Sequence, residues 1–303
     1  MAPHCFTYAQ LRDWPAPESP GVLAVLGDPV AHSLSPQLHT PALRACGIAG
    51  DYIRLEVKEP EFAETLRRMQ QLKFFGANVT IPHKFIALRT VDQVSDQARQ
   101  LGAVNTILFR SGGIEGRNSD GPGFVRAIKE AFGQDVRDLR IMVIGAGGGA
   151  GRAVAVQCAL EQCQRLVLVN RSLDKMISLQ KDVTEILSTN RVLSIAHEQA
   201  SLENALSQVD LVINATNLGM HPHDAPVLAG ASLSAGQLAY DMVYRPHQTS
   251  FLKHACDAGV RASNGLTMLL HQGAVSFEWW FDRPAPLEAM RAGLLAAVDA
   301  LNA

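Results

Sequence analysis

The sequence predicts an α/β protein built from two domains. Its 303 residues are 47% hydrophobic, which is enough apolar material for large cores, and the length is typical of two domains. Short apolar runs alternate with stretches of helical spacing along most of the chain. In the second half, one such run leads into a glycine-rich turn that opens a helix, an arrangement typical of a parallel sheet covered by helices.

Charge and cysteine content exclude several classes of protein. Lys and Arg total 27 against 29 Asp and Glu, a formal net charge of -2, so no strong field attracts nucleic acid or an anionic membrane. The five cysteines are scattered without paired CxxC spacing, and we expect reduced thiols, no disulfide and no metal ion. The sequence has no recognisable signal peptide or membrane-length apolar run, which favours a cytoplasmic location.

The first elements follow a proline-rich start. We expect residues 1–20 to form a poorly ordered leader that contributes little to the folded domains. Residues 22–27 form an apolar run that ends at glycine, which is typical of a buried strand before a turn. Ser35 followed by Pro36 predicts a capped helix, unless Ser35 acts as a ligand instead. The inward side chains of this helix are predicted to be Leu38, Ala42 and Leu43.

The rest of the first half continues the alternation. Residues 52–57 alternate apolar and polar side chains as a strand does, and residues 61–72 have helical spacing. Further strands are predicted at residues 76–79 and 105–109. The predicted helix carries on one face Phe62, Leu66 and Met69.

The second half has a more regular pattern. An apolar strand at residues 141–144 runs into the glycine-rich turn, residues 145–151. A helix is predicted at residues 152–160 and the next strand at residues 166–169. Two more strands are predicted at residues 211–214 and 238–243, with helical structure from Gly265 to the end.

The glycine turn is the first sign of a cofactor. Between a strand and a helix, a GxGxxG-like turn lets the backbone approach a pyrophosphate held at the helix N-terminus. The predicted contacts of this turn are Gly145, Ala146, Gly147, Gly148, Gly149 and Ala150.

The end of the next strand bears on the type of cofactor. It carries Asn170, Arg171 and Ser172, with Lys175 one turn further along. Two cations and a hydroxyl favour the 2′-phosphate of NADP, whereas an acidic residue in this place favours NAD. Asp174 lies close enough to leave NAD possible, and an Arg171 that merely extends into solvent is the alternative.

Lys84 and Asp120 suggest acid-base chemistry. They belong to two short polar segments, residues 76–84 and 118–121, in a largely uncharged setting. A lysine and an aspartate in one pocket can hold and move a proton as a coupled pair, provided that they meet in space. Otherwise Lys84 is a solvated charge at the end of a strand.

At this point the motifs together resemble the shikimate dehydrogenase family, which includes the quinate/shikimate dehydrogenases. Nine of them occur in the family's order between about Val25 and Trp280: HSLSP, GANVTIPHK, GAVNT, NSDGPGF, GAGGGAG, NRS, NATNLGM, YDMVY and GLTMLLHQGA. The resemblance implies an N-terminal α/β substrate-binding domain and a Rossmann-type dinucleotide-binding domain with a parallel sheet. We place the former at residues 1–120 plus 265–303 and the latter at residues 121–264.

The resemblance also implies roles for individual residues. Lys84 is the expected acid/base, and Asp120 orients it and the substrate. Ser33 and Ser35 fall on the family's carboxylate-binding serines, whose hydroxyls donate without the strong field of an arginine. The other implied substrate ligands are Asn78, Thr80, Asn105, Tyr244 and Gln272. The residues implied along the cofactor are Thr216, Asn217, Met220, Val243, Gly265 and Met268.

Three positions depart from the family's usual pattern. Ser119 stands where threonine is more common and keeps the hydroxyl. An added Gly151 displaces Arg152 from the place directly after the glycine loop, so we assign Arg152 no role. His83 stands where many members carry an aromatic residue; it either tunes the lysine or the substrate preference, or is an exposed loop histidine.

The leading hypothesis is a reversible, NADP-dependent reduction of 3-dehydroshikimate to shikimate. The second is an NAD-dependent quinate/shikimate or aminoshikimate dehydrogenase of catabolic or accessory metabolism. A hypothesis of another class is a non-catalytic, cofactor-binding regulator, which the presence of Lys84 and Asp120 disfavours. We expect a small-molecule substrate, no nucleic-acid or membrane partner, and a monomer or homodimer. Gly121, Gly123 and Gly265, at the domain crossings, are either hinges or tight turns.

Overall fold

The computed structural model describes residues 5–15, 22–221, 223–228 and 230–302. The chain divides into two compact units. The first unit comprises Met1–Ser119 and Gln272–Ala303, and the second comprises Asp120–His271. The second crossing therefore lies inside helix α11 (Leu266–Phe281) rather than at the predicted residue 265. The start of α11 is bonded within the second unit, where the hydroxyls of Tyr240 and Thr267 are 2.9 Å apart.

The first unit is built on a seven-stranded mixed sheet with the order β1-β3-β2-β4-β6-β7-β5. Strands β1 to β4 run parallel, whereas β6 is antiparallel to both β4 and β7. The strands are β1 (Cys5–Thr7), β2 (Leu23–Gly27), β3 (Tyr52–Glu56), β4 (Gly76–Val79), β5 (Gln93–Val94), β6 (Thr106–Arg110) and β7 (Gly113–Arg117). The antiparallel pair β6/β7 brings the start of β6 and the end of β7 to the edge where β2 and β4 end.

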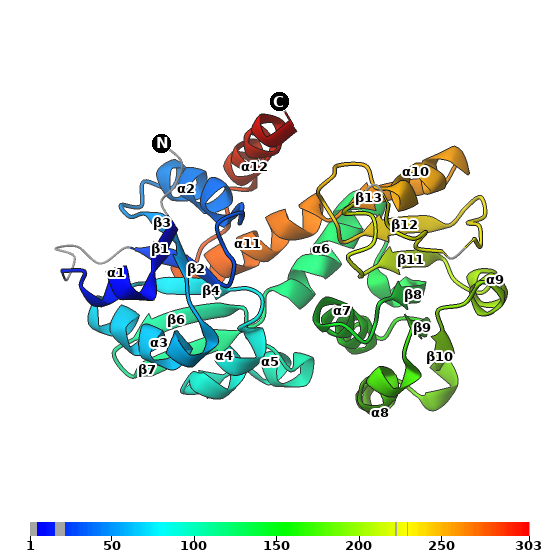
Figure 1. The fold of residues 1–303 in the computed structure, drawn as a ribbon, viewed down its shortest axis with the longest axis horizontal. Helices are drawn as coiled ribbons and strands as arrows, with labels where there is room; N and C mark the ends of the chain where they lie inside the picture. The colour runs from blue at the N-terminus through cyan, green and yellow to red at the C-terminus, as the bar shows by residue number, and fades with distance from the viewer. Residues whose placement is uncertain (1–4, 16–21, 222, 229, 303) are drawn as a thin grey trace. The chain divides into compact units, whose positions relative to one another are not determined.

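Helices pack on both faces of this sheet (Figure 1). Those of the first unit are α1 (Tyr8–Arg12), α2 (Ser35–Ala45), α3 (Phe62–Gln71), α4 (Lys84–Thr90), α5 (Asp96–Leu101), the later part of α11, and α12 (Leu287–Asn302). Although they are far apart in sequence, α2 and α12 lie side by side (Figure 1). Their contact is so close that a Cβ on Gly293 would lie 2.3 Å from the carbonyl oxygen of Gln37.

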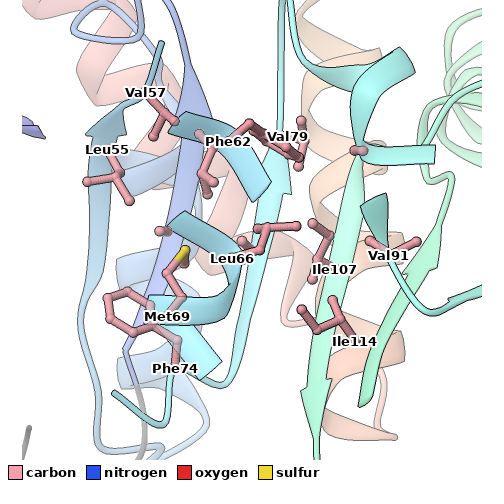
Figure 2. Close-up of a cluster of buried hydrophobic side chains, with 14 of the residues drawn as sticks. Leu55, Val57, Phe62, Leu66, Met69, Phe74, Val79, Val91, Ile107 and Ile114 are labelled. Atoms are coloured by element: carbon pink, nitrogen blue, oxygen red, sulfur yellow. The ribbon is translucent and has the colours of Figure 1, made fainter. Parts of the chain in front are cut away.

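The core of the first unit confirms the predicted helical faces. Phe62, Leu66 and Met69 of α3 are fully buried and point toward the sheet (Figure 2). The predicted inward residues of α2, Leu38, Ala42 and Leu43, are also buried. The 3.6-residue spacing of apolar side chains therefore identified the face that each helix presents to the core.

Two local expectations need correction. Within the segment expected to be a leader, β1 pairs in parallel with β3, and Leu11 of α1 is completely buried. The prolines on both sides of this short segment obscured its apolar pattern in the sequence. Residues 1–4 and 16–20 lie outside the described part of the chain. Ser35 is not the cap of α2, because it is the first helical residue and the N-cap position belongs to Leu34 without a side-chain cap.

The second unit is a six-stranded parallel sheet with the order β10-β9-β8-β11-β12-β13. Counted within the unit this is 3-2-1-4-5-6, the order of doubly wound dinucleotide-binding sheets. The strands are β8 (Arg140–Ile144), β9 (Arg165–Asn170), β10 (Val192–Ala196), β11 (Leu211–Asn214), β12 (Leu238–Asp241) and β13 (Arg261–Asn264). The helices are α6 (Asp120–Phe132), α7 (Gly149–Leu160), α8 (Ile177–Ile186), α9 (Gln199–Leu206), α10 (Ser250–Asp257) and the start of α11.

The edge strands of this sheet were not predicted. Strands β10 and β13 lie at its two ends, and their side chains are half-buried or exposed. They lack the continuous apolar runs of central parallel strands, so the sequence pattern does not single them out. Within the described ranges, no helix combines the length and the apolar character needed to cross a membrane.

Candidate active site

The predicted substrate residues of the first unit gather at one edge of its sheet. The segments after β2 and β4 carry Ser33 and Lys84, and Asn105 directly precedes β6. The register pairs Asn78 at the end of β4 with Thr106, which begins β6. The main-chain N–H of Val104 donates to the carbonyl of Lys84 at 3.0 Å, which holds Lys84 beside Asn105. Ligands of α/β proteins bind at the carboxyl ends of parallel strands, which is the position of this cluster.

A buried network of hydrogen bonds joins the amides of this cluster. The hydroxyl of Tyr52 donates to Asn78 Oδ1 at 2.7 Å, and Asn78 Nδ2 donates to Ser276 Oγ at 2.9 Å. Asn105 Oδ1 accepts from the Ser119 N–H at 2.7 Å, and Asn105 Nδ2 donates to Ser119 Oγ at 3.0 Å. Both Asn78 and Asn105 are nearly fully buried, so internal partners fix the direction of each amide.

Several members of this network were not identified from the sequence. Tyr52, Thr106 and Ser276 are buried, and Ser276 Oγ lies 2.9 Å from Thr106 Oγ1 and 3.0 Å from Ser119 Oγ. Gln272, a predicted ligand, is half-buried one helical turn before Ser276, and its Oε1 lies 3.5 Å from Ser119 Oγ. The one sign of Ser276 in the sequence is a serine among the apolar residues of a predicted helix, where a polar side chain needs a hydrogen-bond partner.

The predicted carboxylate-binding serines lie together at the start of α2. Ser33 Oγ donates to Ser35 Oγ at 3.1 Å and accepts the Ser35 N–H at 3.3 Å. Behind them lies Arg54 of β3, which donates to the main-chain carbonyl of Ser33. Sequence reasoning missed Arg54, because a strand residue twenty-one positions away gives no sign of facing the serines.

His83 is a buried anchor and not an exposed loop histidine. Its ring is fully buried, its Nε2–H donates to the Val57 carbonyl at 2.6 Å, and the ring centre lies 5.0 Å from that of Phe62. His83 is the N-cap residue of α4, and Lys84 is the first residue of that helix. The histidine therefore ties the start of α4, and with it Lys84, to the segment after β3.

The other predicted site residues belong to the second unit. Asp120 is its first residue and begins α6. Tyr244 follows β12 and is half-buried, and burial raises the pKa of its hydroxyl. A Cβ on Gly265 would lie 2.2 Å from the Met242 carbonyl oxygen, so this glycine allows a close crossing of two chain segments. The pairing of Lys84 with Asp120, each from a different unit, stays a prediction.

A pocket of about 630 Å³ lies at the carboxyl ends of β8, β9 and β11. Nine predicted cofactor residues line it, namely Gly145, Gly147, Gly148, Asn170, Arg171, Ser172, Lys175, Thr216 and Asn217. The lining also includes Ile144, His197, Ala215 and Leu218. The other residues predicted along the cofactor are not part of this lining: Ala146, Gly149, Ala150, Met220, Val243, Gly265 and Met268.

The glycine turn leaves space that side chains would fill. Gly145 has a φ of +87°, and a Cβ there would lie 2.6 Å from Thr216 Cγ2. A Cβ on Gly151 would lie 2.2 Å from the Gly145 carbonyl oxygen. Gly151 is therefore the glycine that lets α7 pack against the turn, one position later than GxGxxG spacing requires. The open backbone at the start of α7 fits a pyrophosphate.

The cations around this pocket have different partners. Arg152 forms an ion pair with Asp182 of α8. Arg171 and Lys175 are exposed and line the pocket, and Asn170 Nδ2 donates to the Ser172 carbonyl at 2.9 Å. Arg171 is thus exposed to solvent, as the alternative interpretation predicted, and it also lines the pocket.

Asn214 and Asp241 shape the loop after β11, and the sequence did not single them out. Asn214 Oδ1 accepts from Thr216 Oγ1 at 2.6 Å, and Asn214 Nδ2 donates to Asp241 Oδ1 at 2.9 Å. Burial raises the pKa of the Asp241 carboxyl to about 6, opposed by the hydroxyl of Thr249, which donates to it at 2.5 Å. This buried pair fixes the direction of the Thr216 side chain beside the pocket.

The second unit is a doubly wound sheet with a glycine-rich turn between a strand and a helix. In the same chain, the first unit gathers amides, serines and a lysine at one edge of its sheet. This combination defines a nicotinamide-dependent dehydrogenase. Family models support this class domain by domain. The shikimate dehydrogenase substrate binding domain matches residues 25–107, and the shikimate 5′-dehydrogenase C-terminal domain matches residues 265–295. The saccharopine dehydrogenase NADP binding domain matches residues 141–262.

Whole-chain relatives identify the family. Shikimate dehydrogenase (NADP(+)) of Symbiobacterium thermophilum is 38% identical over 280 residues, which cover 92% of this chain and 95% of that protein. The structure of shikimate 5-dehydrogenase from Thermus thermophilus in complex with NADP(H) and shikimate is 33% identical, with a TM-score of 0.78 and coverage of 91% and 99%. Quinate dehydrogenase from Corynebacterium glutamicum in complex with NAD is 28% identical, with a TM-score of 0.83 and coverage of 91% and 99%. The chain belongs to the shikimate dehydrogenase family.

Proposed function

We propose that the protein catalyses the reversible, NADP(H)-dependent interconversion of 3-dehydroshikimate and shikimate. The observation that carries this proposal is the gathering of Ser33, Ser35, Asn105 and Lys84 at one edge of the first unit's sheet. A serine pair suits a carboxylate, amides suit ring hydroxyls, and a lysine can exchange a proton with the reacting oxygen. The shikimate dehydrogenase (NADP(+)) of Symbiobacterium thermophilum, which is 38% identical to this chain, supports the same activity.

In this mechanism Lys84 delivers a proton to the substrate oxygen during reduction and removes it during oxidation. Asp120 orients the lysine. The nicotinamide, when bound, supplies or accepts the hydride. The hydrogen bond of His83 to the Val57 carbonyl anchors the start of α4, where Lys84 is the first residue.

The ring hydroxyls are assigned to Thr80, Asn105 and Gln272. Asn78 is assigned to the ring hydroxyls as well; like Asn105 it also has internal partners, since its Oδ1 accepts from Tyr52 and its Nδ2 donates to Ser276. These hydrogen bonds fix the amide of Asn78 beside Asn105 and Thr106. Tyr244 contributes from the second unit.

The cofactor is NADP in this proposal. The glycine turn receives the pyrophosphate, and Arg171, Ser172 and Lys175 receive the 2′-phosphate. Their position at the pocket lining supports the assignment. A cytoplasmic location and a monomeric or homodimeric state complete the proposal, and light scattering of the purified protein distinguishes the two states.

The test is a panel of substrates and cofactors with the purified protein. Shikimate and quinate are each offered with NADP⁺ and with NAD⁺, and the absorbance of the reduced nicotinamide is followed from neutral to alkaline pH. We expect the highest kcat/KM for shikimate with NADP⁺. Higher kcat/KM for quinate or for NAD⁺ contradicts the preference, and no reduced cofactor in any combination contradicts the activity.

A further inference from the structure

Arg54 is a buried arginine directly behind the serine pair. Only 5% of its surface is exposed. Nε donates to the Ser33 carbonyl at 2.9 Å, and Nη2 donates to the same oxygen at 2.5 Å. Nη2 also donates to Gln37 Oε1 on α2 at 3.0 Å. The guanidinium thus joins β3 to the loop and helix that carry Ser33 and Ser35.

A buried guanidinium acts strongly on the groups around it, because its charge is screened less than it would be in water. On the serine side it contacts a main-chain carbonyl and a side-chain amide, both neutral. Burial lowers the pKa of Arg54, but a guanidinium remains charged at neutral pH. Glu56, two residues along the same face of β3, shares Lys58 with Asp28: Lys58 Nζ lies 3.9 Å from Glu56 Oε1 and 2.7 Å from Asp28 Oδ1.

Ser35 is the first residue of α2, an eleven-residue helix, and Ser33 lies just before its N-cap residue Leu34. The N-terminus of a helix carries partial positive charge, and its first N–H groups have no partner within the helix. Arg54 adds a full charge on the protein side of the same residues. The two contributions act in the same direction on a negative group that the hydroxyls bind.

We propose that Arg54 is a positioning residue of the carboxylate site, which fixes the Ser33 carbonyl and makes the serine pair selective for an anionic ring substituent without touching it. This inference rests on the proposed function of the serine pair. It replaces the expectation that the serine hydroxyls bind the carboxylate without the strong field of an arginine. It also predicts that the preference for a negatively charged ring substituent depends on Arg54 of β3 together with the start of α2.

The test separates the effect of the Arg54 charge from the effect of its hydrogen bonds, by placing a negative charge beside the guanidinium. In Gln37→Glu the new carboxylate stands beside the guanidinium, so every hydrogen bond of Arg54 can persist while its field is cancelled. We expect KM for shikimate to rise about tenfold to a hundredfold, with kcat within about threefold of the unmodified protein. For the methyl ester of shikimate, which has no negative charge, kcat/KM should change less than about threefold.

The matched control is Gln71→Glu. Gln71 is an exposed residue of α3 whose Oε1 lies 3.5 Å from Arg68 Nη1, so the same change adds a carboxylate beside an arginine away from the serines. Its kinetics should equal those of the unmodified protein. Arg54→Gln should repeat the loss for shikimate, whereas Arg54→Lys, which retains the charge, should keep most of the preference for the acid over the ester.

Each outcome either supports or overturns the inference. Equal losses for acid and ester in Gln37→Glu indicate a structural role only, and an unchanged KM for shikimate removes Arg54 from the carboxylate site. Either result overturns the inference. Calorimetric titration of shikimate into each variant gives the same comparison without turnover. If the unmodified protein does not act on shikimate, the proposed function fails, whereas normal turnover with no Gln37→Glu effect refutes the Arg54 inference alone.

Discussion

A buried histidine in α2 should make the stability of the first unit depend strongly on pH. His39 is fully buried, its ring stacks on Tyr52 at a centroid distance of 4.6 Å, and Trp280 lies 5.2 Å away. Within the described ranges, neither ring nitrogen has a hydrogen-bond partner. Burial lowers the pKa of His39 from 6.5 to about 3, and the nearby Asn78 amide opposes only part of this shift.

The direction of the effect follows from which state takes up the proton. As the pH falls below 6.5, the unfolded chain protonates this histidine first, so the folded state loses stability until the pH reaches about 3. Between pH 7 and pH 4.5 the loss from this one group is about 2 to 3 kcal/mol. His39→Phe should remove it, because phenylalanine keeps the aromatic stack and does not titrate.

The assay is urea unfolding followed by tryptophan fluorescence at both pH values. Trp14, Trp279 and Trp280 are the three tryptophans of the chain, and all belong to the first unit. Asp241 of the second unit, whose pKa is raised to about 6 and whose contribution has the opposite sign, is the same in His39→Phe and in the unmodified protein, so the comparison of the two proteins isolates His39. If His39→Phe loses as much stability on acidification as the unmodified protein, the assignment of the acid sensitivity to His39 is refuted.

Three further predictions concern the proposed catalytic and cofactor sites. Lys84→Met should lower kcat by about a hundredfold to ten-thousandfold while NADPH binding, followed by fluorescence, stays unchanged; full activity would remove the lysine from the chemistry. Gly151→Ala should destabilise the second unit by about 1 to 3 kcal/mol in thermal unfolding, because its Cβ would lie 2.2 Å from the Gly145 carbonyl oxygen, whereas Gly148→Ala, whose Cβ would lie 3.3 Å from the same oxygen, should destabilise it less. Joint replacement of Arg171 and Lys175 by alanine should weaken NADPH binding about tenfold to a hundredfold and leave NADH binding unchanged, and equal losses for both cofactors would argue against a 2′-phosphate site.

The parts of the fold that the sequence predicted are those with local patterns. Central parallel strands such as β8 and β9 are continuous apolar runs, and the glycine turn marks the strand-to-helix crossing between them. The reversal of β6 against β4 was not predicted, because pairing direction depends on contacts between segments about thirty residues apart. That reversal brings Asn105 to the same edge as Lys84, so a pairing direction that has no local signature in the sequence helps to assemble the site.

The same distinction explains which site residues were found. Ser33 and Lys84 belong to compact motifs whose chemistry is recognisable from the residues themselves, whereas Ser276 meets Asn78 across 198 positions and Arg54 meets Ser33 across 21. The consequence concerns specificity rather than fold. A hydroxyl pair considered alone suggests a carboxylate site with a weak field, but the buried guanidinium behind it changes that expectation to a site whose affinity depends on ligand charge. Residues that shape selectivity through a neighbour carry no motif of their own, so they become visible only when the chain is folded.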